Sequence, residues 1–371
     1  MTTTLPFFSG DQLRLARVAQ ALPLEEVALR VAATKQYISQ LETGARKPAE
    51  DLERALADVL GVRTRFFYLN GVPHVRPEQV HFRKQLTTPI SVTSQVIARG
   101  TLLDRLAGEL DGRLKLPKVN FPDLRPSSPA EVDAAALEVR RHWGLGVDGP
   151  ITSMIRVAEN AGAIVTDFIG LSERVDALSM DRPRPIIIRS DAKTSLARQR
   201  FDVAHEVGHL VMHRGIETGD RDTEEQAHRF AGAFLIPTAA FVREFPRRHR
   251  LDWSALFSMK LRWKVAVRAI VHRAYDLGML TAAQFRTANI QLVKTGQAKS
   301  EKYDDELPLE HSELLDAALR KLAARPGRLD KLMDDMGLGY PMLRVLTGTD
   351  YEPLSRASLG NVVAFPSSKG L

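Results

Sequence analysis

The residues that most directly suggest chemistry form the pentapeptide HEVGH at positions 205–209. It lies within a stretch, 196–213, whose apolar spacing predicts a helix. Residues four apart on a helix share one face, so His205 and His209 can bind the same zinc ion. Glu206, next to the first histidine, can take a proton from water that attacks a carbonyl group. The pattern therefore predicts a zinc site that can hydrolyse a peptide bond.

A zinc site of this kind needs a third protein ligand and leaves one position for water. Because the chain contains no cysteine, this ligand has to be a histidine or a carboxylate. Gly215 stands where the metzincin pattern has a histidine, which excludes that subclass. A helix predicted to begin near Thr223 offers Glu224 and Glu225 in its first turn, and His228 follows one turn later.

Helical and strand patterns are mixed in the segment that must position these side chains, 130–300. Helices are predicted at 131–143 and 151–161, strands at 163–166, 176–180 and 185–189, and mainly helices after 194. His213 lies one turn beyond His209, displaced around the helix. We expect it to be structural or to lie next to the ligands rather than to bind the metal.

Three sequence blocks in this segment resemble the ImmA/IrrE family of metallopeptidases. They are 200–213, 224–231 and 234–237, and they follow one another in order with suitable gaps. The resemblance implies an α+β, zincin-like fold, in which a small sheet packs beside the active-site helix, and a zinc cofactor. An edge strand near 177–179 would then hold an extended peptide substrate by strand addition.

The same resemblance implies which residues form the site of a gluzincin-like zinc endopeptidase. The family glutamate three residues before an alanine corresponds to Glu224, the expected third ligand. The expected zinc ligands are thus His205, His209 and Glu224, with Glu206 as the catalytic residue. A second family glutamate is Gln226 here, so Glu225 and His228 remain alternative ligands.

A second motif lies near the N-terminus. Leu24, Val27, Ala28 and Val31 share one face of a short predicted helix, and a break at 32–33 follows. Thr34 is a good N-cap for a second helix, 35–42, whose Ile38 and Leu41 face inward. Two such helices joined by a short turn can place the second in the major groove of DNA.

Polar and basic side chains on and after this second helix suit DNA. Amide and ammonium groups match base edges, and the cations after the helix match phosphates. The expected DNA-contacting residues are Thr34, Lys35, Gln36, Ser39, Gln40, Arg46 and Lys47.

The run 24–48 resembles the Cro/cI (XRE) family of helix-turn-helix domains. The resemblance implies a five-helix domain that binds DNA as a dimer and an internal pair between Arg17 and Glu42. Ala32 replaces the family's turn glycine, and Leu24 replaces a polar residue that often contacts phosphate. The alternative is a helical interaction domain that does not touch DNA, because residues 1–80 carry ten Lys and Arg against nine Asp and Glu.

We therefore expect a multidomain fold: an all-α helix-turn-helix domain, an α+β zincin-like metallopeptidase domain and a helical C-terminal region. The boundaries follow composition shifts such as Asn-Gly-Val-Pro at 70–73. The predicted divisions are 1–72 for DNA binding, 73–129 for a connecting helix and linker, 130–300 for the peptidase, and 301–371 with a loose end.

Composition and charge limit the cellular location and the partners that we expect. The chain has 371 residues and a net charge of +7, and residues 241–300 hold twelve Lys and Arg against three Asp and Glu. This basic block is expected to be a solvated face or an auxiliary phosphate contact. No apolar run reaches the roughly 18–20 residues that cross a bilayer, and no secretion signal begins the chain. We expect a cytoplasmic bacterial protein, nucleoid-associated when bound to DNA, with no membrane partner.

Two functions are compatible with both motifs. The first is a DNA-binding transcription regulator, expected to be a homodimer, whose zinc endopeptidase domain cleaves a repressor-type protein or its own linker. In the second, the peptidase-like domain senses a small ligand, such as a metabolite or acyl-CoA, without proteolysis. Glu206 favours the first, because it is needed for hydrolysis but not for sensing.

Overall fold

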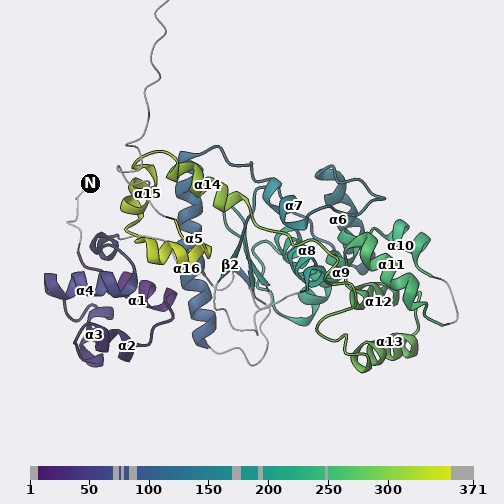
Figure 1. The fold of residues 1–371 in the computed structure, drawn as a ribbon, viewed down its shortest axis with the longest axis horizontal. Helices are drawn as coiled ribbons and strands as arrows, with labels where there is room; N and C mark the ends of the chain where they lie inside the picture. The colour runs from purple at the N-terminus through teal and green to yellow at the C-terminus, as the bar shows by residue number, and fades with distance from the viewer. Residues whose placement is uncertain are drawn as a thin grey trace, which may run out of the picture. The chain divides into compact units, whose positions relative to one another are not determined.

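The computed structural model describes residues 7–69, 75–76, 79–82, 90–168, 177–190, 195–246 and 250–351 (Figure 1). The chain forms two compact units. We call the first the terminal unit, because it joins Met1–Val72 with Asp316–Val345 and Thr349–Leu371. The second, the central unit, comprises Pro73–Leu315 and Leu346–Gly348.

The N-terminal part of the terminal unit is all helical, as expected. Its elements are α1 (Gly10–Ala19), α2 (Leu24–Arg30), α3 (Lys35–Glu42), α4 (Glu50–Leu60) and the short 3-10 helix η1 (Thr64–Tyr68). Thr34 caps α3, since its side chain accepts a hydrogen bond from the backbone N–H of Tyr37. The inward residues Val27, Ile38 and Leu41 are fully buried, so the apolar spacing predicted the core face correctly.

Three C-terminal helices are α14 (Leu314–Ala323), α15 (Arg328–Met336) and α16 (Tyr340–Thr347). The α15–α16 turn packs against the turn that follows α4. Arg63 N donates to Gly337 O at 2.9 Å, and Gly339 N donates to Gly61 O at 3.0 Å. Most of the helical C-terminal region thus completes the unit that contains the helix-turn-helix, rather than forming a region of its own.

The central unit contains a four-stranded sheet of order β1-β3-β4-β2. Its strands are β1 (Val80–Phe82), β2 (Ile164–Phe168), β3 (Ala177–Met180) and β4 (Ile186–Ser190). β2 is parallel to β4, whereas β3 is antiparallel to both β4 and β1. The prediction of an edge strand near 177–179 was therefore wrong in this structure, because β1 pairs along the outer side of β3.

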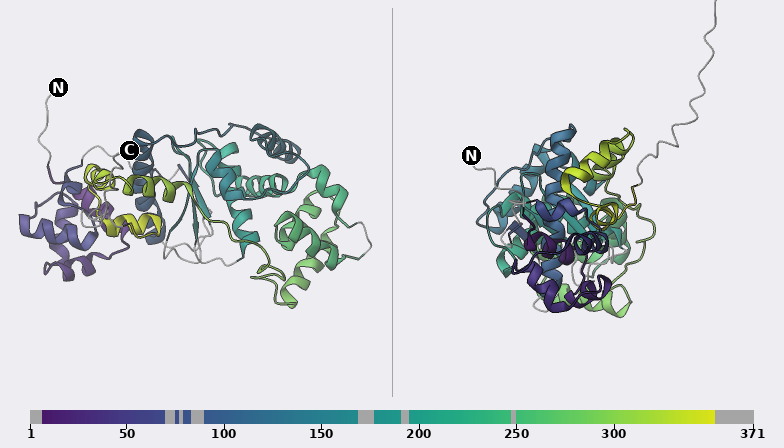
Figure 2. Two further views of the ribbon diagram at one scale, coloured as in Figure 1. Left: turned by 45° about the horizontal axis from the view of Figure 1, so that its top comes forward. Right: turned by 90° about the vertical axis from the view of Figure 1, so that its left-hand side faces the viewer.

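The strand β1 comes from the segment expected to be a linker. The other described helices of the central unit are α5 (Ile90–Arg113), α6 (Pro129–His142), α7 (Met154–Asn160), α8 (Leu196–Met212), α9 (Arg221–Leu235), α10 (Thr238–Glu244), α11 (Trp253–Trp263), α12 (Val267–Asp276) and α13 (Ala282–Lys294). α5 lies on one side of the sheet and α8 on the other (Figures 1 and 2).

Part of the basic block has an internal role. Lys260 is fully buried and pairs with Asp304 at 2.6 Å and with Glu301 at 3.2 Å. Arg273 is also buried and lies 3.3 Å from Asp133. These two cations are structural rather than part of a solvated face.

Some predicted features lie outside the described residues: the boundary at 70–73, residue 176 of the second predicted strand, residues 247–249 of the basic block and the end of the chain after 351. Among the described helices, none is long and apolar enough to cross a membrane.

Candidate functional site

Two helices position the predicted metal ligands. α8 carries His205 and His209 one turn apart, and a Cβ at Gly208 would lie 3.0 Å from the Phe230 ring of α9. Glycine therefore allows α9 to approach α8 closely. Asp220 caps α9 by accepting from Thr223 N at 3.0 Å, which fixes the first turn that carries Glu224.

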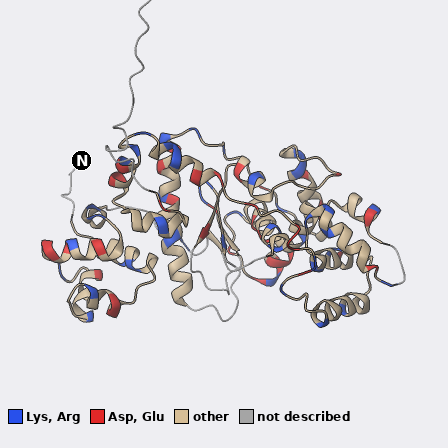
Figure 3. Cartoon of the chain, viewed as in Figure 1, with Lys and Arg blue, Asp and Glu red and all other residues tan. Residues whose placement is uncertain are grey.

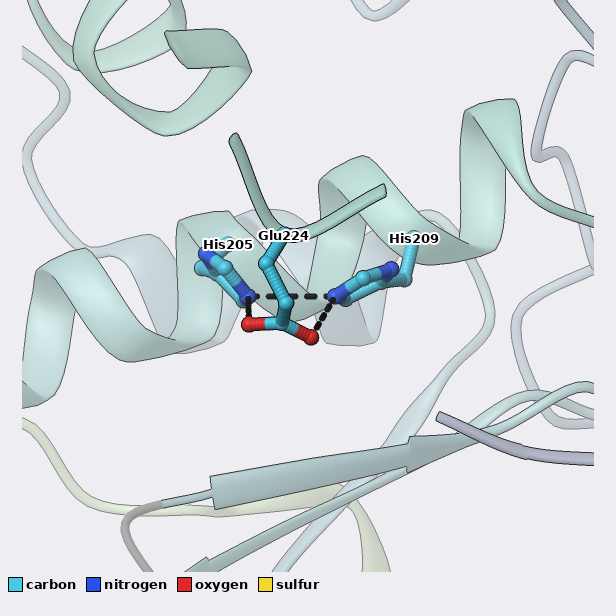
Figure 4. Close-up of side chains that lie close together, drawn as sticks. All are labelled: His205, His209 and Glu224. Atoms are coloured by element: carbon cyan, nitrogen blue, oxygen red, sulfur yellow. Dashed lines mark hydrogen bonds and ion pairs between the residues drawn. The ribbon is translucent and has the colours of Figure 1, made fainter. Parts of the chain in front are cut away.

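Figure 4 shows that the Glu224 carboxylate lies between the two imidazoles. His205 Nε2 and His209 Nε2 are 3.1 Å apart, and the Glu224 oxygens lie 3.4 and 3.5 Å from them. Ligands about 2.0–2.1 Å from a tetrahedral zinc ion lie about 3.3 Å from one another. These separations are close to those between zinc ligands, and the three side chains could hold a metal ion.

The protonation of these groups also suits a metal. Burial lowers the pKa of His209 to about 4, so its imidazole is neutral at pH 7. Burial raises the pKa of Glu224, but contacts with His205 and His209 outweigh this effect and bring the pKa well below its usual range. A neutral imidazole and an ionised carboxylate are the forms that bind zinc.

A hydrogen-bond chain orients His209. His213 Nε2 lies 2.8 Å from Gln226 Oε1, and His213 Nδ1 lies 2.9 Å from His209 Nδ1. Burial lowers the pKa of His213, which favours the neutral ring. The Gln226 oxygen can only accept, so Nε2 of His213 carries the proton and its Nδ1 accepts from His209. Nε2 of His209 is then left with a free lone pair facing His205 and Glu224.

Glu206 is buried and its carboxylate is held by strand β3. Ser179 donates its hydroxyl proton to Glu206 Oε2 at 2.6 Å. Burial raises the pKa of Glu206 to about 7, against the opposing effects of His205 and Ser179. A carboxyl with such a pKa can accept and return a proton near neutral pH.

His81 on β1 is a site residue that the sequence analysis missed. Its ring stacks on that of His209, with centroids 5.2 Å apart and planes at 11°. Its Nδ1 lies 3.0 Å from Thr218 Oγ1, and burial lowers its pKa to about 3. A single histidine in a segment without a motif gives no sequence signal of this contact.

The alternative ligands lie elsewhere. Glu225 is exposed and pairs with Arg221 at 2.8 Å. The His228 ring packs against Phe201, with centroids 4.7 Å apart, and does not belong to the cluster of described ligand atoms. A cavity of about 790 Å³ opens beside His205; its lining also includes Glu224, His228, His272, Tyr275 and Asp276.

The expected DNA-contacting residues lie on and after α3. Thr34, Lys35, Gln36, Arg46 and Lys47 are exposed, and Ser39 and Gln40 are half-buried. An open hollow of about 400 Å³ is lined by Thr34, Gln36, Tyr37, Gln40 and Arg46. Lys35 also pairs with Glu25. Positive and negative residues are interspersed along these helices (Figure 3), so the local pattern, not a strongly basic surface, supports DNA contact.

Two details of the helix-turn-helix follow the family resemblance. The pair between Arg17 and Glu42 is confirmed and bidentate, with N–O distances of 2.5 and 2.9 Å. Ala32 has a φ of 51°, in the left-handed region that favours glycine. Ala32 thus takes a backbone conformation that glycine adopts more readily.

Comparisons with known families agree with this arrangement. Residues 161–275 match the model of the IrrE N-terminal-like domain, and residues 13–67 match the helix-turn-helix model. No curated protein matches the chain. The matches and the fold define a DNA-binding regulator with a peptidase-like domain. The chain is a fusion of an XRE-type helix-turn-helix domain with an ImmA/IrrE-like metallopeptidase domain.

Proposed function

We propose that this regulator is an active zinc-dependent endopeptidase that cleaves a repressor-type protein or itself. The observation that carries the proposal is the geometry of three side chains: His205 Nε2 and His209 Nε2 lie 3.1 Å apart, and each lies within 3.5 Å of one oxygen of the Glu224 carboxylate. Ligand sensing would need at most the metal ligands. Hydrolysis also needs a proton acceptor, and Glu206 beside the ligands can serve as one.

The chain's own residues have distinct roles in hydrolysis. Zinc, when bound, supplies Lewis-acid activation of water and of the substrate carbonyl. Glu206 accepts the proton of the attacking water and returns it to the leaving amine. Ser179 fixes the orientation of the Glu206 carboxylate through its 2.6 Å hydrogen bond. A cavity of about 790 Å³ opens beside His205 and Glu224, so a ligand can reach that side of the site.

The proposal is tested with purified wild type and Glu206→Gln, prepared without chelator. Zinc is quantified, and each protein is incubated with repressors encoded beside its gene. We expect about one zinc ion per chain in both proteins and cleavage only by the wild type. His205→Ala is the matched control that should lose zinc. Absence of zinc from the wild type would overturn the metal assignment, and zinc without cleavage would favour ligand sensing.

For DNA recognition, we expect Gln36 and Gln40 to contact bases and Arg46 and Lys47 to contact phosphates. The preferred sequence is selected from random DNA and compared with a scrambled one. Gln36→Ala or Gln40→Ala should weaken specific binding by about tenfold or more, whereas Lys47→Ala should weaken binding to both sequences alike. Equal binding of the two sequences by the wild type would contradict base recognition and favour an interaction domain.

The resemblance to XRE domains also supports a homodimer that acts on DNA in the bacterial cytoplasm. A dimer would prefer two half-sites about one helical turn, roughly 34 Å, apart. Analytical ultracentrifugation with and without such a DNA duplex tests this prediction, and a single chain on each duplex would refute it.

A further inference from the structure

Strand β1 covers the outer side of β3, next to the candidate active site. His81 is paired with Ser179, and Val80 with Met180, in an antiparallel register. The matched peptidase domain begins at residue 161 and thus includes β2, β3 and β4 but not β1. In a domain without β1, β3 would be the edge strand, and its outer backbone N–H and C=O groups would be open to an additional strand.

Several contacts hold the β1 segment in place. Gln79 O accepts from Asp181 N at 3.0 Å, and Gln79 Oε1 accepts from Arg182 at 2.8 Å. Val75 is buried, and its N–H donates to Thr101 Oγ1 at 3.0 Å. The segment is therefore docked along β3 by backbone pairing, the same interaction that binds extended peptides to a sheet edge.

β1 also brings a side chain against the catalytic groups. His81 lies opposite Ser179, which holds Glu206, and its ring covers that of His209. His81 is only 2% exposed, and its buried Nε2 has no hydrogen-bond partner among the described residues. Burying a nitrogen without a hydrogen-bond partner costs free energy. The His81 side chain therefore makes the docking of β1 less favourable than a side chain whose polar atoms were all paired.

We propose that the outer edge of β3 binds extended peptides and that residues 79–82 occupy it as an internal competitor of the substrate. This inference rests on the proposed peptidase function. The ligand class is an extended peptide, recognised mainly through its backbone, which must displace β1 to reach the residues beside the metal ligands. His81 takes the place of a substrate side chain.

The hydrogen-bond pattern between β1 and β3 identifies a substitution that should release β1 selectively. Bonded and non-bonded pairs alternate along such a ladder. Because Asp181 N bonds to Gln79 O, the next bonded pair is His81 with Ser179. His81→Pro removes a ladder donor and should release β1. His81→Phe keeps that donor and a ring against His209 but loses the hydrogen bond of His81 Nδ1 to Thr218, and it is the control for the side chain.

The first measurement is peptide binding in a Glu206→Gln background, which prevents cleavage of the probe. The probe is a fluorescein-labelled peptide with the sequence of residues 76–85, RPEQVHFRKQ, followed by anisotropy. Adding His81→Pro should strengthen its binding by about tenfold or more, because more molecules have an open edge. Adding His81→Phe should change binding far less than His81→Pro does, because the ladder donor remains. Equal binding by all three proteins, or no binding to the His81→Pro variant, would overturn the inference.

Hydrogen exchange provides a second measurement and a check on folding. Amides of 177–181 should exchange faster in His81→Pro, whereas those of α8 should stay protected. If His81→Pro does not fold, His81→Ala, which removes the ring contact with His209 and the hydrogen bond to Thr218, should show the same changes at smaller size. Unchanged exchange and binding in a folded variant would overturn the inference.

The outcomes separate this inference from the proposed function. If the peptide binds as expected but no variant cleaves any repressor, the peptide-binding edge stands and the peptidase function fails. If the wild type cleaves a repressor and neither probe binding nor cleavage rate increases in His81→Pro, the function stands and the internal competitor fails.

Discussion

At the residue scale, Gln226 has a role that its sequence position does not reveal. In the sequence it is a departure from the family pattern, because a glutamate is expected there. In the structure it accepts from His213 at 2.8 Å, and His213 in turn contacts His209. Partners that orient a ligating histidine also tune its affinity for the metal. The glutamine thus stabilises one tautomer of His209.

Gln226→Leu should lower zinc affinity by about 10–100-fold, because His213 loses the acceptor that sets its tautomer. Gln226→Glu should retain tight binding, since a carboxylate also accepts from Nε2. Glu225→Gln, an exposed neighbour, is the control and should have no effect. Competition with a zinc-binding dye measures the affinities, and equal affinities in wild type and Gln226→Leu would contradict this role.

The site was only partly predictable at this scale. His205, His209 and Glu224 could be found because two of them share a helix face and the third opens the next helix. Ser179 and His81 contact the site through strand pairing between positions 98 residues apart. No local pattern in the sequence specifies that register, so their roles required the structure.

At the element scale, a buried carboxyl joins α7 to the start of α14. Glu159 accepts from the backbone N–H groups of Glu313 and Leu314, each at 3.0 Å. Burial raises the pKa of Glu159 to about 7, although these hydrogen bonds oppose the change. Between pH 4.5, the ordinary pKa, and about 7, the folded state therefore binds more protons than the unfolded state.

This difference has a definite sign for stability. The free energy of unfolding should fall as pH rises through that window and should level off above it. Glu159→Gln removes this contribution. As the pH rises through this window, the free energy of unfolding should therefore fall by up to about 3 kcal/mol more in the wild type than in the variant. Denaturant unfolding at pH 4.5 and 7.5 measures the difference. Glu225→Gln, at an exposed ion pair with Arg221, should behave like the wild type, and parallel profiles for wild type and Glu159→Gln would refute the prediction.

The sequence predicted most elements that place the site. The expected helix 196–213 is α8, and the three expected strands correspond to β2, β3 and β4. The apolar spacing of α8 and the β-branched residues of β2 and β4 favour these structures locally. β1 has three residues, too few to show a period of two, and it forms only because β3 offers a partner.

At the scale of the whole molecule, the terminal unit, which contains the helix-turn-helix, is built from both ends of the chain. Contacts between the α4 turn and the α15–α16 turn join residues more than 270 positions apart, such as Arg63 and Asp334. The sequence predicted a helical C-terminal region but not its association with the helix-turn-helix. Cleavage in the segment between the helix-turn-helix and the peptidase would leave these noncovalent contacts in place.

The close packing at Gly337 tests this association. Its φ is 65°, and a Cβ there would lie 2.7 Å from the Cα of Phe66. Gly327 has a similar φ of 72° but open space around it. Gly337→Ala should therefore destabilise the terminal unit by about 1–3 kcal/mol more than Gly327→Ala. Thermal unfolding and DNA binding measure the effect, and equal losses in both variants would show that the contact contributes little.

The most direct test of active zinc-dependent proteolysis is a survey of new protein N-termini in cells. Wild type and Glu206→Gln are expressed at matched levels with the neighbouring genes, and N-terminal peptides are labelled and identified by mass spectrometry. We predict a new N-terminus, in a repressor-type protein or in this chain itself, that occurs with the wild type and is absent with Glu206→Gln. Identical sets of N-termini, with zinc bound to both proteins, would contradict proteolysis.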